Sequence, residues 1–397
     1  MNTYNETLRG LINFGLGGDT WQEWVDRYRE QYDTLEVDGF EFAVPKLTYE
    51  WKQIIASTGM TPLPTYVDPE SEGYEVALRQ LAGLTGNVPT QKQFYRINRT
   101  ILLEKLQLLE QFGNAFYTPE MQDVFMGLMD ESTEGLIQSF SNAMTHQRMQ
   151  LVSKGKFEIN AVNNPRGLQD ITITFGIPED HFDVLEGSAR WWTSDEHIPA
   201  NEGADSDPIE YCKQRVRWIR KAKRYRGALK MEISQDLWDD LCQHSKVRDE
   251  ITRVKHNLSS NEKTIAALSR SLNDEEIKEW FAKLIKVDQI VPRDSIATVV
   301  KPGKDENGDP DLVEAEIENF CPTNIAFIPV GKIGDIQGVR PLSMGYDPED
   351  VAKFHDGRLL LTTRTVPKTH SIYIDSEFAQ LCVPSMPKYM FHSTVTA

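Results

Sequence analysis

Residues 118–155 read TPEMQDVFMGLMDESTEGLIQSFSNAMTHQRMQLVSKG, and this stretch is the strongest architectural signal in the 397-residue chain. Thr118 is a typical helix-capping residue, Pro119 suits the first helical position, and apolar residues then recur at steps of three, four or eight. The pattern predicts one long amphipathic helix that ends at Gly155. At about 1.5 Å per residue this helix is roughly 50 Å long, as long as a compact domain, so we expect it to act as scaffolding.

A β-hairpin pattern follows the predicted helix directly. Phe157 and Ile159 alternate with polar neighbours, and residues 163–167 (NNPRG) are a strong turn signal. The alternation resumes from Ile171 to Phe175. The sequence therefore predicts a long helix followed at once by a two-stranded hairpin.

The composition indicates a globular protein with a substantial core. With 397 residues, of which 40% are apolar, the chain is expected to form two domains with additional excursions. No apolar run approaches eighteen residues, and the N-terminus lacks the basic start and apolar stretch of a signal peptide, so we expect a soluble protein made in a cytoplasm. The four cysteines are far apart in sequence and are expected to be buried, reduced thiols.

The net charge of −17 argues against a protein that coats nucleic acid, because phosphate binding depends on Lys and Arg. Any DNA near this protein is expected to be contained and not gripped. The same charge opposes association of copies, so an assembling protein would need extensive local complementarity.

The first fifty residues are rich in aromatic side chains. Trp21, Trp24, Tyr28 and Tyr32 recur at helical spacing, with too little apolar sequence around them for an independent core. Two interpretations follow: this arm docks on a neighbouring subunit, or its helix packs on its own domain.

Residues 60–99 are interrupted by closely spaced Pro and Gly residues, which predicts a long hairpin-like loop. Long excursions of this kind are usually functional or disordered. The interleaved aromatic residues favour an ordered contact surface, and a loop insertion without a partner is the alternative. The aromatic residues are Tyr66, Tyr74, Phe94 and Tyr95.

The second half of the chain alternates helix and strand signals and predicts an α+β protein. Asp207, Ser234 and Asn273 each cap an expected helix. Strands are expected at residues 229–233, 296–300, 312–317 and 325–330, and residues 359–396 are rich in β-branched and aromatic residues.

Signatures of enzymes and cofactor sites are missing or incomplete. Residues 15–19 (GLGGD) lack the third glycine of a dinucleotide loop and the lysine of a P-loop, and the eight histidines have no metal-ligand spacing. Residues 305–316 resemble a calcium loop, but Pro310 occupies the position that requires glycine. The neighbouring carboxylates Asp239-Asp240 and Glu275-Glu276 are expected on helix surfaces. We therefore predict no catalytic residue, no cofactor and no metal ligand.

Residues 213–226 (KQRVRWIRKAKRYR) form a dense basic run in an acidic protein. The run could pair with carboxylates of an adjacent subunit, form a solvated helix face, or contact nucleic acid. A chain with a net charge of −17 offers more carboxylate partners than phosphate partners, which favours the first interpretation over the last.

The order of these segments resembles that of tailed-phage major capsid proteins, and within them the lambda-type group, phage capsid protein E. The resemblance covers most of the chain from about residue 40 and depends on the order of several loose motifs. The matching segments are residues 207–209, which open a helix, the strand 228–233, the helix 234–247, the segment 321–332 (CPTNIAFIPVGK) and the closing 382–387 (CVPSMP).

The resemblance implies a Hong-Kong-97-type capsid fold of the α+β class. It implies an N-terminal arm, an extended β-hairpin loop, a peripheral domain with a long spine helix, and an axial domain around the symmetry axis. On this sequence the expected boundaries are residues 1–54 for the arm, 55–109 for the extended loop and its return, 110–206 for the peripheral domain with its spine at 118–154, 207–350 for the axial domain, and 351–397 for the return to the peripheral domain.

The function implied by the resemblance is assembly without catalysis. Pentamers and hexamers of the chain would form an icosahedral shell around the double-stranded DNA of a tailed bacteriophage, without sequence-specific binding and without a membrane. The short N-terminal region implies a separate scaffolding protein, and a portal and decoration or head-completion proteins are further expected partners. The protein would be assembled in the host cytoplasm and reside in the virion.

Three segments are expected to make the inter-subunit contacts. Other functions remain as alternatives: an encapsulin-type compartment that encloses cargo, and a hydrolase that uses acidic residues. The predicted contact residues are Tyr66, Tyr74, Arg79, Lys92, Phe94, Tyr95, Arg96 and Arg99 in the extended loop, Arg215, Arg217, Arg220, Lys221 and Arg224 in the basic helix, and Trp21, Trp24 and Tyr28 in the arm.

Overall fold

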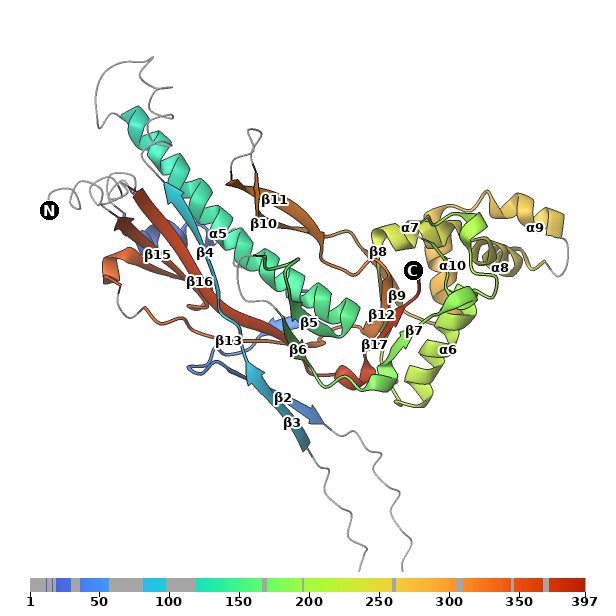
Figure 1. The fold of residues 1–397 in the computed structure, drawn as a ribbon. Helices are drawn as coiled ribbons and strands as arrows, with labels where there is room; N and C mark the ends of the chain where they lie inside the picture. The colour runs from blue at the N-terminus through green and yellow to red at the C-terminus, as the bar shows by residue number, and fades with distance from the viewer. Residues whose placement is uncertain are drawn as a thin grey trace, which may run out of the picture. The chain divides into compact units, whose positions relative to one another are not determined.

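The computed structural model of the chain contains helices and sheets in comparable measure (Figure 1), which confirms the α+β class. It describes residues 12, 16, 19–29, 36–56, 81–97, 119–165, 170–194, 196–258, 262–304, 310–343, 346–366 and 371–396. The chain divides into two compact units. Unit 1 comprises Met1–Trp51, Asn87–Arg148 and Ile336–Cys382, and unit 2 comprises Lys52–Gly86, Met149–Asp335 and Val383–Ala397.

The long helix predicted from the sequence is present as α5 (Pro119–Lys154), with 36 residues. The proposed cap, Thr118, lies outside the described residues. Gly155 ends the helix in a left-handed conformation with φ of 69°, and its N–H donates to the Leu151 carbonyl over 2.8 Å. A Cβ atom at Gly155 would lie 2.6 Å from the Phe182 ring, so only glycine fits this position.

The main sheet of unit 1 has six strands. Five lie in the order β1 (Phe40–Phe42), β13 (Gly334–Val339), β16 (Ser371–Pro384), β15 (Leu359–Val366) and β14 (Val351–Phe354), and β4 (Gln91–Ile97) also pairs with β16. The Phe140 ring of α5 meets the Phe378 ring of β16 edge to face, with 5.0 Å between centroids. One face of the sheet therefore packs on α5, as the buried alternate residues Ile372 and Ile374 also indicate.

The predicted extended loop has paired strands at its two ends. β2 (Glu50–Ala56) pairs with β3 (Leu81–Asn87) in a separate two-stranded sheet. The predicted contact residues Tyr66, Tyr74, Arg79 and Arg99 lie outside the described residues, so their contacts stay a prediction.

The assignment of the aromatic arm to subunit contacts needs correction. α2 (Trp21–Asp26) begins with a capping box between Thr20 and Glu23, and the side chains of Trp21, Trp24 and Tyr28 are buried within unit 1. The Trp21 indole N–H donates to the Leu361 carbonyl of β15 over 3.2 Å. The arm therefore packs on its own unit, because strands from the far end of the chain supply the apolar surface that the local sequence lacks.

Unit 2 is built around a five-stranded sheet covered by helices (Figure 1). The strand order is β7 (Phe182–Val184), β17 (Phe391–Thr394), β12 (Asn324–Pro329), β8 (Leu229–Ser234) and β9 (Gln289–Arg293). Leu229, Met231 and Ile233 point into the apolar core between this sheet and the helices. The helices of unit 2, apart from the end of α5, are α6 (Pro208–Lys221), α7 (Gln235–Gln243), α8 (Ser245–His256), α9 (Glu262–Ser269) and α10 (Asp274–Ile285).

The three helix caps predicted in this half of the chain are confirmed. The side chains of Asp207, Ser234 and Asn273 accept hydrogen bonds from backbone N–H groups in the first turns of α6, α7 and α10. The sequence analysis did not anticipate α8 and α9, which follow α7 after a one-residue break and a short connection respectively.

Unit 2 also contains the hairpin predicted after the long helix, and it pairs the strands predicted at residues 296–300 and 312–317. β5 (Lys156–Ile159) pairs with β6 (Ile171–Thr174), and β10 (Ile296–Lys304) pairs with β11 (Pro310–Glu318), both antiparallel. Residues 305–309, which include most of the calcium-like positions, lie outside the described residues. Short 3-10 helices occur at Glu179–His181, Gly187–Ala189, Pro199–Asn201, Pro348–Asp350 and Pro387–Tyr389.

Strand pairing does not follow the segment boundaries expected from the sequence. β7 and β17 join the sheet of β8, β9 and β12, although both strands lie outside residues 207–350. β13 lies within that range and pairs in the sheet of unit 1. The difference has a simple physical origin, since strands pair with neighbours in space and local patterns do not identify those neighbours.

Candidate protein–protein surfaces

The outer face of the unit 1 sheet carries a cluster of aromatic and charged side chains. In the antiparallel register of β4 and β16, Arg96 lies opposite Tyr373, Phe94 opposite Asp375, and Lys92 opposite Glu377. Alternate residues of a strand share one face, so these side chains lie together on the face turned away from α5. We call Lys92, Phe94, Arg96, Arg364, Tyr373, Asp375 and Glu377 the outer β4 face.

Aromatic rings and arginines contact each other on the outer β4 face. The Phe94 ring is 5.6 Å from the Tyr373 ring, and 54% of the Phe94 side chain is exposed. The guanidinium of Arg364 lies 4.5 Å from the Tyr373 ring centre and donates to both carboxylate oxygens of Asp375, at 2.6 and 3.3 Å. This hydrogen bonding with Asp375 raises the pKa of Arg364. Exposed aromatic rings beside arginine are typical of the residues that contribute most binding energy at interfaces.

The structure separates the four described contact residues of the extended loop into two groups. Lys92, Phe94 and Arg96 lie on the outer β4 face, where the Lys92 ammonium is 2.8 Å from Glu377 and the Arg96 Nε donates to the Ser371 hydroxyl over 3.0 Å. Tyr95 lies on the other face, where its hydroxyl packs so closely on α5 that a Cβ at Gly135 would be 2.6 Å away. Only Phe94 is both exposed and aromatic on the outer β4 face.

The basic helix α6 divides its cations between the interior of unit 2 and the solvent. Arg215 is paired with Asp183 and lies over the rings of Tyr211 and Phe391, at 4.9 and 5.4 Å. Arg220 donates to the Lys286 carbonyl over 3.2 Å. Arg217, Lys221 and Arg224 are exposed, and no carboxylate in the described part of the chain lies within ion-pair distance of them. Of the five predicted contact residues, these three remain available to a partner, but Arg224 lies beyond the end of α6 at Lys221, in a left-handed conformation with φ of 58°, and is not part of the helix.

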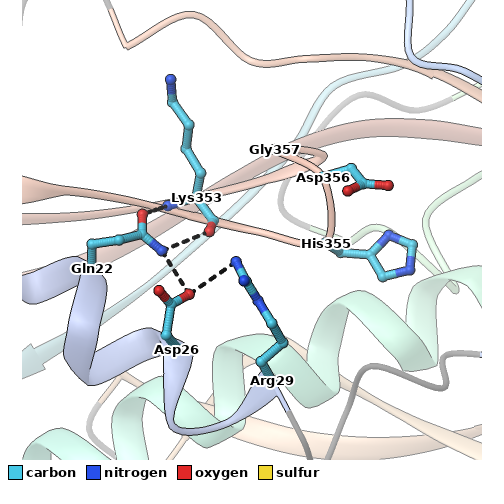
Figure 2. A pocket seen from close by; sticks show the side chains of 7 residues that line it. All are labelled: Gln22, Asp26, Arg29, Lys353, His355, Asp356 and Gly357. Atoms are coloured by element: carbon cyan, nitrogen blue, oxygen red, sulfur yellow. Dashed lines mark hydrogen bonds and ion pairs between the residues drawn. The ribbon is translucent and has the colours of Figure 1, made fainter.

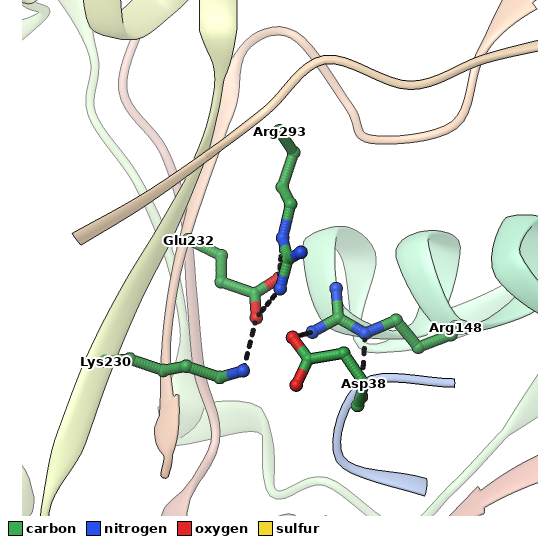
Figure 3. Close-up of polar contacts among 5 residues, drawn as sticks. All are labelled: Asp38, Arg148, Lys230, Glu232 and Arg293. Atoms are coloured by element: carbon green, nitrogen blue, oxygen red, sulfur yellow. Dashed lines mark hydrogen bonds and ion pairs between the residues drawn. The ribbon is translucent and has the colours of Figure 1, made fainter. Parts of the chain in front are cut away.

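Unit 2 buries a charged cluster that the sequence analysis missed. Glu232 of β8 is fully buried, its carboxylate is 3.1 Å from the Lys230 ammonium, and both of its oxygens accept from the Arg293 guanidinium at 2.8 and 3.0 Å (Figure 3). The alternation of Lys230 and Glu232 with apolar residues suggests a solvent-facing side of the strand, but the structure covers both sides. The available sequence signal is Arg293, which directly follows the apolar residues Ile290, Val291 and Pro292.

A second buried cation belongs to unit 1. Arg148 of α5 is 1% exposed, and its guanidinium donates to the Asp38 carboxylate over 3.0 Å and to the Asp38 carbonyl over 3.2 Å (Figure 3). Two hydrogen bonds to one residue fix the segment before β1 against the helix.

A buried histidine, His392, holds the end of α5 against the unit 2 sheet. The Nδ1 atom of His392 in β17 lies 2.8 Å from the Val152 carbonyl of α5, and the ring stacks on Phe182 at 5.2 Å. Burial lowers the pKa of His392 to about 4 and also lowers the pKa of His181, whose Nδ1 atom is 2.6 Å from the Met390 carbonyl. Both imidazoles are therefore neutral near pH 7.

Acidification is expected to destabilise the folded chain through His392. The pKa of His392 is about 4 in the folded chain and 6.5 in the unfolded chain, so between these pH values the unfolded chain binds more protons. The stability that comes from keeping His392 neutral is fully present above pH 6.5. About 3 kcal/mol of it is lost as the pH falls toward 4. Denaturant unfolding at pH 7 and pH 4.5 measures the loss, which His392→Asn should reduce and His256→Asn, at an exposed position, should not. Equal losses in all three proteins would contradict this assignment.

A polar depression of unit 1 lies where α2 meets the turn between β14 and β15 (Figure 2). Its volume is about 420 Å³. The side chains bind one another: Gln22 exchanges hydrogen bonds with the Lys353 backbone at 2.7 and 3.0 Å, and Asp26 pairs with Arg29 at 3.0 Å. The depression therefore fastens α2 to the sheet. It is lined by Gln22, Asp26, Arg29, Lys353, His355, Asp356 and Gly357.

The described residues show neither a metal centre nor a membrane-spanning helix. They contain no group of three or more His, Cys, Asp or Glu residues placed to hold a metal ion. None of their helices combines the length and apolar character needed to cross a bilayer.

Sequence comparison identifies the family. The profile of the family described as phage major capsid protein E matches residues 66–273, which is more than half of the chain. The chain belongs to the phage major capsid protein E family. The match includes α5, the basic helix α6 and β3–β4 at the base of the extended loop. Curated protein sequences contain no match to this chain.

Solved phage capsids resemble this major capsid protein at low sequence identity. The mature capsid of bacteriophage PhiM1 has 9% identity and a TM-score of 0.40, with 90% of this chain and 85% of that chain covered. The satellite phage P4 procapsid has 10% identity and a TM-score of 0.44, covering 94% and 99%. Gordonia phage Cozz has 10% identity and a TM-score of 0.43, with 90% of this chain and 84% of that chain covered.

Family membership confirms the resemblance to phage capsid protein E inferred from the order of the segments. This chain is therefore a shell-forming major capsid protein. The encapsulin-type compartment is not favoured by this result. The arm, the strands at the base of the extended loop, the long helix and the separate helix-covered sheet agree with the Hong-Kong-97-type fold that the resemblance implied.

Proposed function

We propose that this major capsid protein assembles as pentamers and hexamers into an icosahedral shell that encloses the double-stranded DNA of a tailed bacteriophage. The observation that carries the proposal is the family match over residues 66–273. The net charge of −17 fits a container that surrounds DNA without binding it tightly, because a strongly acidic chain has no excess of Lys and Arg to neutralise phosphates. Catalysis plays no part in this function.

Electron microscopy of the purified protein tests the proposal. Closed particles with pentameric and hexameric units are the expected result. Particles from phage-producing cells should protect double-stranded DNA from nuclease, whereas a cargo compartment should contain protein. A monomer that turns over a substrate and never assembles would contradict the proposal and favour an acidic-residue hydrolase.

The segments of the chain are proposed to form different parts of the capsid subunit. Residues 1–54 form the arm, 55–109 the extended loop, 110–206 with 351–397 the peripheral domain, and 207–350 the axial domain around the symmetry axis. The pairing of β7 and β17 with β8, β9 and β12 supports moving these two strands to the axial domain, and the pairing of β13 supports moving it to the peripheral domain.

The proposed partners beyond copies of the chain are a separate scaffolding protein, a portal, and decoration or head-completion proteins. Assembly takes place in the host cytoplasm, and the finished protein resides in the virion. Expression of the chain alone and together with the neighbouring phage genes tests the need for scaffolding. Uniform shells from the chain alone would remove that part of the proposal.

The extended loop is proposed to lie over the peripheral domain of a neighbouring copy, with Phe94 as an aromatic anchor at its base. Tyr66, Tyr74, Arg79 and Arg99 would extend this contact along the loop. Support comes from the exposure of Phe94 between charged residues that are already partnered within the chain. An interface of this kind gains affinity from aromatic side chains and specificity from the charge pattern.

Phe94→Ala is expected to weaken assembly about tenfold or more while leaving the unassembled protein folded. More than half of the Phe94 side chain is exposed, so its removal costs the fold little. The measurement is the protein concentration at which shells appear by light scattering, with Val162→Ala as the control at another exposed apolar position. An unchanged threshold for Phe94→Ala would count against this contact.

A further inference from the structure

The hairpin of β10 and β11 presents a row of three carboxylates. Its antiparallel register places Glu314, Glu316 and Glu318 opposite Val300, Thr298 and Ile296, so the three glutamates share one face of the hairpin. All three are exposed, and no Lys or Arg in the described part of the chain lies within ion-pair distance of them. We call these three residues the glutamate row.

No described residue of its own copy neutralises the glutamate row. Residues two apart on a strand are about 6.7 Å from each other, so the three charges repel. Glu318 also faces Asp236 of α7, and its partial burial together with this negative charge raises the pKa of Glu318. Two strands alone are marginally stable in water, so a cation that bound this face would relieve repulsion and brace the hairpin.

The basic helix α6 presents cations at a matching spacing. Lys213, Arg217 and Lys221 lie at positions i, i+4 and i+8, which places them in one stripe with a rise of about 6 Å per step. The glutamate row repeats every 6.7 Å or so, and the long Lys and Arg side chains can absorb the difference. We call these three residues the cation row, and no carboxylate in the described part of unit 2 is paired with any of them.

One copy of the chain does not bring the two rows together. Both belong to unit 2, and Figure 1 shows the β10–β11 hairpin projecting from the sheet away from α6. Two different complementary patches on one subunit produce head-to-tail contacts, and such contacts close into rings when the rotation between copies permits.

We propose that the cation row of α6 in one copy binds the glutamate row of β11 in the next copy, as three side-by-side ion pairs between subunits. The proposal rests on the shell assembly described above and names the partner of the basic helix. Binding of α6 to DNA phosphates is the competing interpretation. The glutamate row favours the protein partner, because every copy offers a similarly spaced anionic surface that no cation among the described residues pairs with.

Charge reversal in both directions tests the pairing. The first variant carries Lys213→Glu, Arg217→Glu and Lys221→Glu, and the second carries Glu314→Lys, Glu316→Lys and Glu318→Lys. Each alone is expected to raise the assembly threshold at least tenfold at low salt, because like charges then face each other between copies. The chain with all six changes, and an equimolar mixture of the two variants, should both recover association.

A control variant with Arg253→Glu, Lys263→Glu and Arg270→Glu has the same change in net charge as the first variant, at exposed positions of unit 2. It should assemble like the parent. Thermal unfolding of each variant before assembly separates a lost contact from a lost fold. Raising the salt from about 0.1 M to about 1 M should weaken the parent contact, because the screening length falls from about 10 Å to about 3 Å.

Several outcomes would overturn the pairing. The pairing is overturned if the first variant folds and assembles normally. If that variant also loses DNA retention, binding of α6 to nucleic acid replaces the proposed pairing. The pairing is also overturned if neither the six-change chain nor the mixture associates while every protein is folded. Association in the mixture is measured by sedimentation and does not require a closed shell. A parent chain that forms no shells therefore refutes the proposed function without deciding the pairing.

Discussion

Glu232→Leu is expected to lower the free energy of unfolding of the full chain by about 3–5 kcal/mol, because it leaves the buried Lys230 and the partly buried Arg293 without their shared carboxylate. Lys230 and Arg293 both bind Glu232, and the Glu232 side chain is fully buried. The Lys230 ammonium in particular, whose side chain is only 5% exposed, stays out of water while the strand stays in place. Denaturant unfolding of the unassembled protein at pH 7 measures the loss.

Two further variants separate the buried charge from a general effect of losing a glutamate. Glu279→Leu removes the exposed partner of Lys283 and should cost less than about 0.5 kcal/mol. Replacing the whole cluster, with Lys230→Met, Glu232→Leu and Arg293→Met, should recover most of the stability, because a packed apolar cluster removes the desolvation cost of all three charges. A single Glu232→Leu change that costs no more than the Glu279 control would refute this account.

Trp24→Ala is expected to cost about 3–5 kcal/mol in the unassembled chain, as for other fully buried Trp residues. The ring lies inside unit 1 on a helix that packs on β14 and β15, so its removal leaves a cavity. Thermal unfolding of the monomer before and after the change measures the loss. Gln22→Ala on the same helix is the partner control, and it should cost only about 1 kcal/mol through lost hydrogen bonds.

This experiment separates the two interpretations of the aromatic arm. If the arm docked on a neighbouring subunit, Trp24→Ala would leave the monomer as stable as the parent and would affect only the assembled shell. An unchanged melting temperature of the monomer would therefore reinstate the inter-subunit assignment that the burial of Trp21, Trp24 and Tyr28 argues against.

The parts of the fold that depend on neighbouring residues were predicted well. The long helix, its glycine stop and the caps at Asp207, Ser234 and Asn273 depend on backbone groups within one turn of the residue concerned. The hairpins of β5–β6 and β10–β11 are also local, since a turn joins two adjacent patterned segments. α8 was missed because no Ser, Thr, Asn or Asp side chain caps it; His244 occupies the cap position without a side-chain hydrogen bond.

The candidate surfaces were predicted only in part, because exposure depends on segments that are distant in sequence. Lys92 and Arg96 look free in the sequence, yet β16 supplies partners to both. Arg215 finds Asp183 and Phe391 from two other segments. The glutamate row became visible only through the register of β11 with β10, which places its three carboxylates on one face.

The sequence by itself determined the long helix α5, the α+β class and, through the order of its motifs, the capsid protein family, because these depend on local periodicity and on segment order. Only the tertiary structure decided which charges are buried, where the aromatic arm packs, and which cations of α6 remain free. Those outcomes depend on how strands hundreds of residues apart pair and cover one another, and the hydrophobic and hydrogen-bonding forces that select such pairings act between surfaces that exist only after folding.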